Sequence, residues 1–471
     1  MLYKRILSNY LQNDNETLFY NDGGRKYTWK DSSFYVSYLI KNYLIDAKNK
    51  GKEIYLTSSK SFETYCLILA CYLIGLSYTP IDFRDKKRLK EIDEDSIIFS
   101  STKINDISLI RLDFKESKLI DSINENTIKD ICNYYEFNSK NIVYKMTSSG
   151  TTGEPKVIPI NSINLENYIN QINKLSIFKS GDIFSQIPNL TFDLSVHDIF
   201  LSFFHKGTLV PISSDLGPLF TRFVKNIQIN HIMAVPSFLD IALRNNATPL
   251  KNVVNIFLCG ESLRSDVAKR IIKSFPNAKC FNLYGPTECT IAVLFYDFSD
   301  KEIDMSLDQI PIGKPFCFNH AELSKNGELF ISGKQVFDGY LTKNPSPFFE
   351  NGGRKFYKTG DLCKSIDSGY YFLGRIGSQI KFRGYRVEIE GLENYLSNLL
   401  KSEVILIPHN EISRSNFKDI TIFHSNEILE KLEIIRLLPP HLSSVSVKFI
   451  QQIPRSKSFK VDRKKIYLEF L

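Results

Sequence analysis

The chain has 471 residues, of which 43% are hydrophobic and 24% charged, and its formal net charge is +8. This composition excludes a largely disordered chain, because disorder needs low hydrophobicity and a high net charge. The length exceeds what a single hydrophobic core supports, so we expect at least two domains.

Basic residues form only short runs, at 86–88 and 463–465, which indicates a solvated surface and no nucleic-acid partner. The eight cysteines are scattered without a Cys-x-x-Cys pair, as expected of reduced thiols. The most apolar stretch, 65–78, is shorter than the ~20 residues needed to cross a bilayer. The N-terminus lacks the apolar core of a signal peptide. We therefore expect a cytoplasmic protein without a membrane partner.

Strand-like and helix-like segments alternate along most of the chain. A β-prone run at 54–56 precedes an apolar helical stretch at 62–75 and an extended segment at 78–81. Further strands are expected at 142–144, 231–235, 254–258 and 280–282, with helices at 216–226 and 263–275. This alternation predicts an α/β fold with mostly parallel sheets.

The pattern changes at about residue 310. Short strands separated by turns are expected at 328–333, 356–360 and 370–373, which predicts a small β-rich unit closing the first domain. The remainder reads as a small α+β domain whose first helix covers about 389–400. Gly374 and Gly377 lend flexibility to the intervening chain. We therefore expect a large domain over 1–376 and a small, mobile domain over 377–471.

Three polar turns follow short apolar strands. The first, TSSGTTGEPK at 147–156, offers hydroxyl, amide and Lys donors that can surround phosphate oxygens. It is not a Walker loop, since no Gly-Lys-Ser/Thr ends it. The second, NLYGPTE at 282–288, combines an aromatic face, a hydroxyl and a carboxylate. The third places Asp361 directly after Gly360, where a carboxylate can accept ribose hydroxyls. Each turn taken alone is also compatible with an ordinary surface turn.

The order of these motifs resembles that of the adenylate-forming superfamily, which includes acyl-CoA synthetases, firefly luciferase and peptide-synthetase adenylation domains. The resemblance covers nearly the whole chain. Its further motifs are YLIGLSYTPID at 72–82, FDLS at 192–195, GELFISGKQVFDGYL at 327–341, GRIGSQIKFRGYR at 374–386 and PRSKSFKVDR at 454–463. The resemblance implies that 1–376 is an AMP-binding adenylation core.

The resemblance also implies a role for each motif. Glu288 would bind Mg²⁺, Asp361 would hold the ribose of ATP with help from Arg375, and Lys460 would be the catalytic residue, which also touches ATP at the α-phosphate. The residues implied to hold the β- and γ-phosphates are Thr147, Ser148, Ser149, Gly150, Thr151, Thr152, Gly153 and Lys156. Those implied to line the nucleotide are Asn282, Leu283, Tyr284, Gly285, Pro286 and Thr287, with Tyr284 against the adenine.

Asp193 is the residue most informative about the substrate. In amino-acid-activating relatives the matching Asp binds the α-ammonium group, which acyl and aryl substrates lack. His197 lies one helical turn further on, where it either lines the pocket or pairs with Asp193. The other pocket positions implied by the motifs are mostly bulky and apolar: Leu258, Cys259, Phe281, Leu283 and Ile291. The motifs around Asp193 and Cys259 most resemble D-alanine–D-alanyl carrier protein ligases, although Cys259 also fits an ordinary buried thiol.

We therefore expect a ligase that uses ATP and Mg²⁺ to activate a small amino acid, with D-alanine as one candidate. The acceptor would be the phosphopantetheine thiol of a separate carrier protein, since no carrier motif follows in the chain. An acyl- or aryl-CoA ligase and a non-catalytic nucleotide-binding relative are the alternatives. The amino acid, its enantiomer, the carrier and the oligomeric state stay open.

Overall fold

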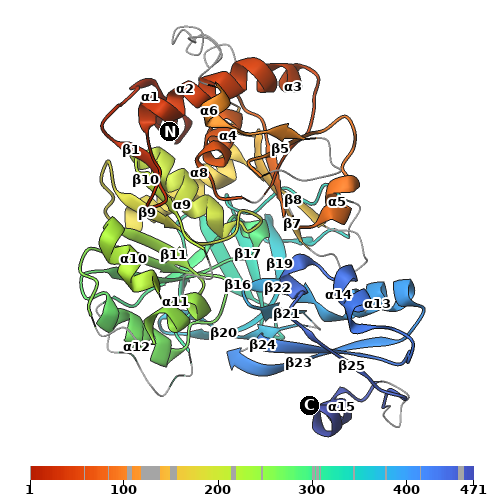
Figure 1. Ribbon diagram of the computed structural model, residues 1–471. Coiled ribbons are helices and arrows are strands. Elements are labelled where there is room, and N and C mark those ends of the chain that lie inside the picture. The colour runs from red at the N-terminus through yellow and green to blue at the C-terminus, as the bar shows by residue number, and fades with distance from the viewer. Residues whose placement is uncertain are drawn as a thin grey trace.

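The architecture was derived from a computed structural model of the chain. In Figure 1 the two large sheets and their helices run from the top of the view down its left side, a β-rich unit lies in the middle, and a small C-terminal unit lies at the lower right. The structure describes residues 2–57, 59–82, 84–102, 109–117, 138–148, 156–213, 219–244, 248–299, 303, 307, 309–342, 345–376, 379–413, 415–454 and 461–471.

A nine-stranded sheet forms the centre of the large body. Its strands in spatial order are β15 (Lys314–Pro315), β14 (Leu294–Asp297), β13 (Lys279–Tyr284), β12 (Asn255–Leu258), β11 (His231–Ala234), β9 (Ile183–Gln186), β10 (Thr208–Pro211), β1 (Leu18–Asn21) and β2 (Lys26–Thr28). The six strands from β13 to β1 run parallel, and the strands at the two edges are antiparallel to their neighbours.

A six-stranded sheet lies beside it. Its order is β6 (Ile110–Arg111), β5 (Ile97–Ser100), β3 (Ile54–Thr57), β4 (Tyr78–Ile81), β7 (Ile142–Ser148) and β8 (Lys156–Asn161). Only the β7–β8 pair is antiparallel. The predicted α/β class with mostly parallel sheets is therefore confirmed.

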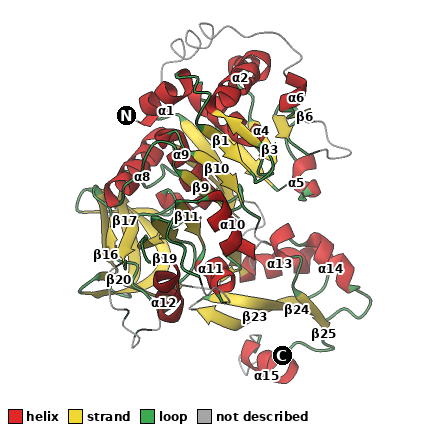
Figure 2. Cartoon of the chain, turned by 60° about the vertical axis from the view of Figure 1, so that its left-hand side comes forward, coloured by secondary structure: helices red, strands yellow, loops and turns green. Residues whose placement is uncertain are grey.

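Helices cover both sheets, and two separate apolar cores lie between the helices and the sheets (Figures 1 and 2). Helix α4 is buried along its whole length, so its sequence shows no polar face. The helices of the large body are α1 (Leu2–Leu11), α2 (Trp29–Leu39), α3 (Ile45–Asn49), α4 (Phe62–Leu73), α5 (Lys86–Lys90), α6 (Phe114–Ser117), α8 (Ser162–Leu175), α9 (Leu194–His205), α10 (Phe220–Ile227), α11 (Pro236–Leu243) and α12 (Ser265–Ser274). A π-helical turn, Ile40–Leu44, joins α2 to α3.

An antiparallel β-rich unit follows, as the sequence predicted. It contains β16 (Asn319–Leu323), β17 (Glu328–Gly333), β18 (Phe348–Asn351), β19 (Arg354–Ile366) and β20 (Gly369–Arg375). The C-terminal unit has its own apolar core. It contains β21 (Gln379–Phe382), β22 (Tyr385–Glu388), α13 (Ile389–Leu400), β23 (Val404–Ser413), β24 (Asn416–His424), α14 (Lys431–Leu437), β25 (Ser446–Phe449) and α15 (Arg463–Phe470). The domain division at residue 376 stays a prediction.

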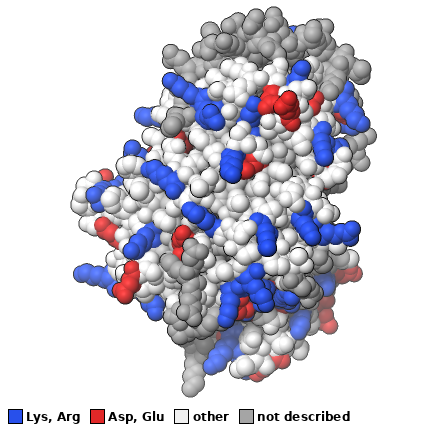
Figure 3. Space-filling view, turned by 90° about the vertical axis from the view of Figure 1, so that its left-hand side faces the viewer, with Lys and Arg blue, Asp and Glu red and all other residues white. Residues whose placement is uncertain are grey.

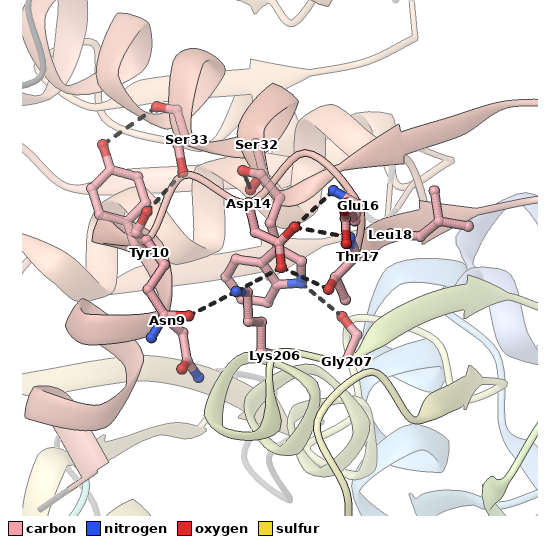
Figure 4. Close-up of polar contacts among 12 residues, drawn as sticks. Asn9, Tyr10, Asp14, Glu16, Thr17, Leu18, Ser32, Ser33, Lys206 and Gly207 are labelled. Atoms are coloured by element: carbon pink, nitrogen blue, oxygen red, sulfur yellow. Dashed lines mark hydrogen bonds and ion pairs between the residues drawn. The ribbon is translucent and has the colours of Figure 1, made fainter.

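Helix α9 begins directly after Asp193 and is anchored at its far end, as Figure 4 shows. Lys206 ends the helix in a left-handed conformation, with φ of 55°, and its Nζ lies 2.7 Å from Oδ2 of Asp14. This ammonium holds the pKa of Asp14 well below its usual range. Asn9 also donates to two carbonyls in the last turn of the helix, at 2.9 and 2.8 Å. The N-terminal segment therefore fixes the helix that follows Asp193.

Candidate active site

The turn after strand β13 is tightly folded. A Cβ on Gly285 would lie 2.6 Å from Cα of Ala292, so no other residue fits there without a shift of the backbone. The chain doubles back through Thr290 and Ile291, which both have positive φ, of 58° and 69°. Val293 then donates to the carbonyl of Tyr284 at 2.7 Å. The close return of the chain fixes the positions of the side chains at 282–288.

Tyr284, Asp361 and Arg375 meet in one buried cluster. The Tyr284 hydroxyl donates to Oδ2 of Asp361 at 2.5 Å, and Nε of Arg375 lies 2.6 Å from Oδ1 of the same carboxylate. Arg375 also donates to the carbonyl of Thr359 at 3.0 Å. Strands β13, β19 and β20 thus bring together three side chains that lie up to 91 residues apart, from Tyr284 to Arg375.

Glu288 lies at the other end of the turn and is buried. Its Oε1 accepts from the Tyr340 hydroxyl at 2.8 Å, and the Lys156 ammonium lies 5.4 Å from the centre of the Tyr340 ring. Tyr340 therefore connects the end of the first polar motif to the second. A single buried carboxylate of this kind suits Mg²⁺, which proteins usually bind through one or two carboxylates together with substrate phosphates.

The two ends of the first motif, at 147–148 and at 156, form strands where the sequence suggested a loop. Thr147 and Ser148 belong to strand β7, and Lys156 begins strand β8, where it pairs with Ser148. Antiparallel pairing of the two flanks extends the strands into the motif. Ser149, Gly150, Thr151, Thr152 and Gly153 lie outside the described residues, as do Lys460 and Gly377.

Asp193 is buried at the start of α9, close to the turn after β13. Burial raises the pKa of its carboxyl to about 6, although a hydrogen bond from the Thr287 side chain opposes the rise. Within the described parts of the chain, its Oδ2 has no hydrogen-bond partner. An unpaired carboxylate oxygen in a dry site favours a cationic ligand, because burial of an uncompensated charge is costly.

His197 is not paired with Asp193. Its Nδ1 lies 2.7 Å from the Tyr168 hydroxyl of helix α8, and its ring centre lies 4.7 Å from that of Phe257. Burial lowers the pKa of the imidazole to about 3, so the ring is neutral. No partner of Nε2 occurs among the residues that the structure describes.

The apolar residues predicted to line the pocket do not all meet. Cys259, Phe281, Leu283 and Ile291 are buried in one cluster with His197's neighbour Phe257, whereas Leu258 packs in a different cluster, with Ile256 and Cys280. Successive side chains of a strand point to opposite faces of the sheet, so Leu258 and Phe257 cannot share a face. Phe257 therefore takes the place that the sequence suggested for Leu258.

Cys259 follows strand β12, and its Sγ lies 3.8 Å from the carbonyl of Ile291. Burial raises the pKa of this thiol to about 12, and the charge of Asp193 adds to the rise. The thiol is therefore protonated at neutral pH and acts as a small apolar wall beside Asp193.

Two charged residues that the sequence did not single out line a small pocket at the turn after β13. Lys381 of β21 and Glu261 face it together with Tyr284. Burial raises the pKa of Glu261 and lowers that of Lys381, and each side chain offsets part of this effect in the other. Lys381 belongs to the motif at 374–386. The alternation of apolar and basic residues at 380–383 is the only sequence feature that could have indicated a side chain of β21 facing the site.

The C-terminal unit thus contributes to this pocket. Tyr385 of β22 packs edge-on against Phe192, with ring centres 4.3 Å apart, and its other face stacks on His441. Asn416 of β24 hydrogen-bonds Glu261. Helix α15, which follows Lys460 by a few residues, lies at the opposite side of the unit in Figures 1 and 2.

The surface and the helices add two observations. Lys and Arg are spread over the face shown in Figure 3 and do not form one continuous patch. None of the helices in the described part of the chain has both the length and the apolar character to cross a membrane. Across these same residues, no group of three His, Cys, Asp or Glu side chains is placed to hold a metal ion.

Comparison with known families and proteins gives a consistent result. The family model described as AMP-binding enzyme matches residues 9–341. The D-alanine–D-alanyl carrier protein ligase of Lactococcus lactis is 28% identical over 474 residues, which cover 93% of each chain. The ligase of the same name from Staphylococcus aureus is 30% identical over 346 residues, covering 69% of this chain and 70% of that relative.

Solved structures show the same fold. The Vibrio cholerae adenylation domain AlmE, in complex with glycyl-adenosine-5'-phosphate, superposes with a TM-score of 0.80 at 24% identity, over 99% of this chain and 97% of its own. Holo-PA1221, a peptide-synthetase protein with adenylation and carrier domains, has a TM-score of 0.79 at 19% identity, over 99% of this chain and 84% of its own.

Proposed function

We propose, on the premise that the chain belongs to the AMP-binding enzyme family, that it joins a small amino acid to AMP and passes it to a carrier thiol. In the first step a carboxylate oxygen of the amino acid attacks the α-phosphorus of ATP, and the bond to pyrophosphate breaks. In the second step a thiolate attacks the carbonyl carbon, and AMP leaves. The acceptor would be the phosphopantetheine of a separate carrier protein.

The observation that carries the proposal is the position of Asp193. Its unpaired Oδ2 is buried beside Thr287 of the turn after β13, the nucleotide turn (residues 282–288). At this place the carboxylate and ammonium of an amino acid would both be near the α-phosphate. A fatty or aryl acid would leave this carboxylate unpaired, so an acyl- or aryl-CoA ligase is the weaker candidate. The names of the relatives support D-alanine as the first substrate to test and a carrier protein as the acceptor.

The nucleotide would lie between the three polar motifs. Asp361 is fixed by Tyr284 and Arg375, which suits an acceptor of two ribose hydroxyls. Glu288 would hold Mg²⁺, which would offset negative charge on the phosphate oxygens when bound. The phosphates would lie against the 147–156 motif, with Lys156 at its end. Asn282 lies beneath the turn and donates to the carbonyl of Pro311 at 2.8 Å, so it supports the turn.

Two lysines of the C-terminal unit would serve the two steps. Lys460 would place positive charge at the α-phosphate during adenylation, when charge builds on the non-bridging oxygens. Lys381 lies at the nucleotide turn in the present arrangement. Since both lysines would act at the same site, the small unit would rotate between the two steps. The change in backbone direction would occur near Gly377.

Amino-acid-dependent exchange of labelled pyrophosphate into ATP tests the function directly. We expect exchange with small amino acids and none with fatty or aryl acids. Asp193→Ala should abolish it while ATP binding persists, whereas Asp266→Ala, which alters a half-exposed ion pair on α12, should leave it unchanged. Exchange driven by fatty or aryl acids in the wild type would disprove the proposal.

A second variant tests the step assigned to Lys460. Lys460→Ala should lower exchange by several powers of ten and leave ATP affinity nearly intact, since its charge acts mainly in the transition state. Near-normal exchange in this variant would remove Lys460 from the mechanism. Loading of a phosphopantetheine-bearing carrier, followed by mass, then tests the transfer step.

A further inference from the structure

Helix α9 and the residue before it hold four buried polar atoms without a hydrogen-bond partner among the described residues, and two of them are the carboxylate oxygens of Asp198. The other two lie one helical turn apart. They are Oδ2 of Asp193 and Nε2 of His197, and both side chains are buried, with His197 0% exposed. Residues four apart on a helix lie on the same face, with Cβ atoms about 5–6 Å apart. The two atoms therefore belong to one wall, which continues past Asp193 to the Thr287 side chain of the nucleotide turn.

The orientation of the imidazole is fixed by its neighbours. The Tyr168 hydroxyl lies 2.7 Å from Nδ1, and the Phe257 ring packs against the imidazole at 4.7 Å between centres. Phe257 in turn stacks on Phe281, at 5.3 Å. No described residue offers Nε2 a hydrogen-bond partner within this aromatic surround. A buried polar atom normally has a hydrogen-bond partner, because leaving it unpaired costs free energy.

A hydroxyl group fits Nε2 in either protonation form of the neutral ring. If Tyr168 donates to Nδ1, then Nε2 carries the proton and needs an acceptor. If Nδ1 donates to Tyr168, then Nε2 is an acceptor and needs a donor. A hydroxyl can do both, a methyl group can do neither, and a carboxylate could serve only the first form.

The size of the side chain is limited by the other walls. Cys259, Phe281, Leu283 and Ile291 are all buried in the same apolar core as Phe257, which packs against the imidazole. In an amino acid bound through its ammonium at Asp193, only three covalent bonds separate the nitrogen from a hydroxyl on the β-carbon. A substrate this short can contact both Asp193 and His197, because the two residues are only one helical turn apart. A longer substrate side chain is not needed to reach His197.

We propose that Nε2 of His197 pairs with a hydroxyl on the β-carbon of the substrate, so that the enzyme activates serine in preference to alanine or glycine. This inference rests on the proposed amino-acid-activating function and specifies its substrate class. Tyr168 is a positioning residue in this scheme, because it acts only by holding the imidazole. Which enantiomer of serine is used depends on the side of the pocket that Cys259 closes, and the exchange assay determines it.

The test is pyrophosphate exchange by the wild-type enzyme with glycine and both enantiomers of alanine, serine and threonine. We expect kcat/KM for one enantiomer of serine to exceed that for alanine about tenfold or more, because a site that hydrogen-bonds a hydroxyl rejects the analogue without it. Equal or better use of alanine or glycine would overturn the inference and leave the proposed function intact. Absence of exchange with every amino acid would overturn both.

Matched variants separate recognition from folding. The amide of Gln reaches the place of Nε2, whereas the shorter amide of Asn reaches only that of Nδ1. His197→Gln should therefore keep the preference for serine, and His197→Asn should lose it. Tyr168→Phe should weaken the preference without changing KM for ATP. If His197→Asn retains the serine-to-alanine ratio, or if both variants lose it equally while staying folded, the assignment to Nε2 is wrong.

Discussion

Replacing Asp193 by Asn should stabilise the fold at neutral pH while abolishing amino-acid activation. The carboxyl has a pKa of about 6 in the folded chain, against an ordinary value of 3.8, because the site is dry. Below pH 3.8 the group is protonated in both states and favours neither. Between pH 3.8 and 6 the folded state binds a proton that the unfolded chain releases, so stability falls as pH rises through this window.

The full effect is about 3 kcal/mol, since each pKa unit corresponds to about 1.4 kcal/mol. Asn has the shape of the protonated carboxyl, and its oxygen can still accept from Thr287. The variant and the wild type should therefore have similar stability at low pH. Above pH 6 the variant should be more stable by up to about 3 kcal/mol, because it carries no buried charge.

Urea unfolding at pH 5 and pH 8 measures this difference. The advantage of Asp193→Asn should grow by roughly 1 kcal/mol between the two, because about one pH unit of the window in which the charge costs stability lies above pH 5. Asp266→Asn, at a half-exposed carboxylate, provides the control, for which no such growth is expected. An advantage that is equal at both pH values, or a variant less stable than the wild type at pH 8, would refute the idea that Asp193 is ionised at a cost to the fold.

Three further predictions concern the site. KM for the amino acid should rise about tenfold per pH unit below pH 6, where Asp193 is protonated and cannot hold an ammonium, while KM for ATP stays flat; parallel changes in both would implicate another group. Gly285→Ala should destabilise the chain by about 1–3 kcal/mol and weaken ATP binding, as seen by calorimetry, since its Cβ would lie 2.6 Å from Ala292 Cα; unchanged ATP affinity would contradict this. Lys381→Met should slow carrier loading at least about tenfold and leave pyrophosphate exchange within a few-fold, and the reverse split would assign Lys381 to adenylation.

Local pattern was enough to predict most elements of the fold. The strand expected at 78–81 and the helix expected at 389–400 agree with β4 and α13, and 328–333 agrees with β17. In each case a change of apolar period or a Gly marks the ends. The start of α12 was expected at 263 but lies at Ser265, because the chain at Arg264 is extended and pairs with Gln309, a contact invisible in the local sequence.

Side-chain direction within the central sheet could not be predicted. Strand β12 is buried on both faces, so its residues are apolar without alternation, and no polar position shows which face each residue takes. The choice between Phe257 and Leu258 as a wall of the pocket therefore required the register with β13. The contacts that anchor the end of α9 could not be predicted either, because Asn9 and Asp14 lie about 190 residues before it in the sequence.

The role of Lys381 was hidden for a related reason. A lysine in a short strand of a small unit is usually solvent-exposed, whereas Lys381 is partly covered where this unit meets Phe192 and Glu261. Tyr385 meets Phe192 edge-on and Asn416 hydrogen-bonds Glu261, so these contacts of the C-terminal unit at the site are partly polar. Arg463, by contrast, is held by a paired contact to Glu393 and by the Leu406 carbonyl inside the same unit. Helix α15, which begins at Arg463, is thus anchored within the C-terminal unit. The proposed alternation of Lys381 and Lys460 at the site therefore predicts that the unit rotates as a whole between the two steps.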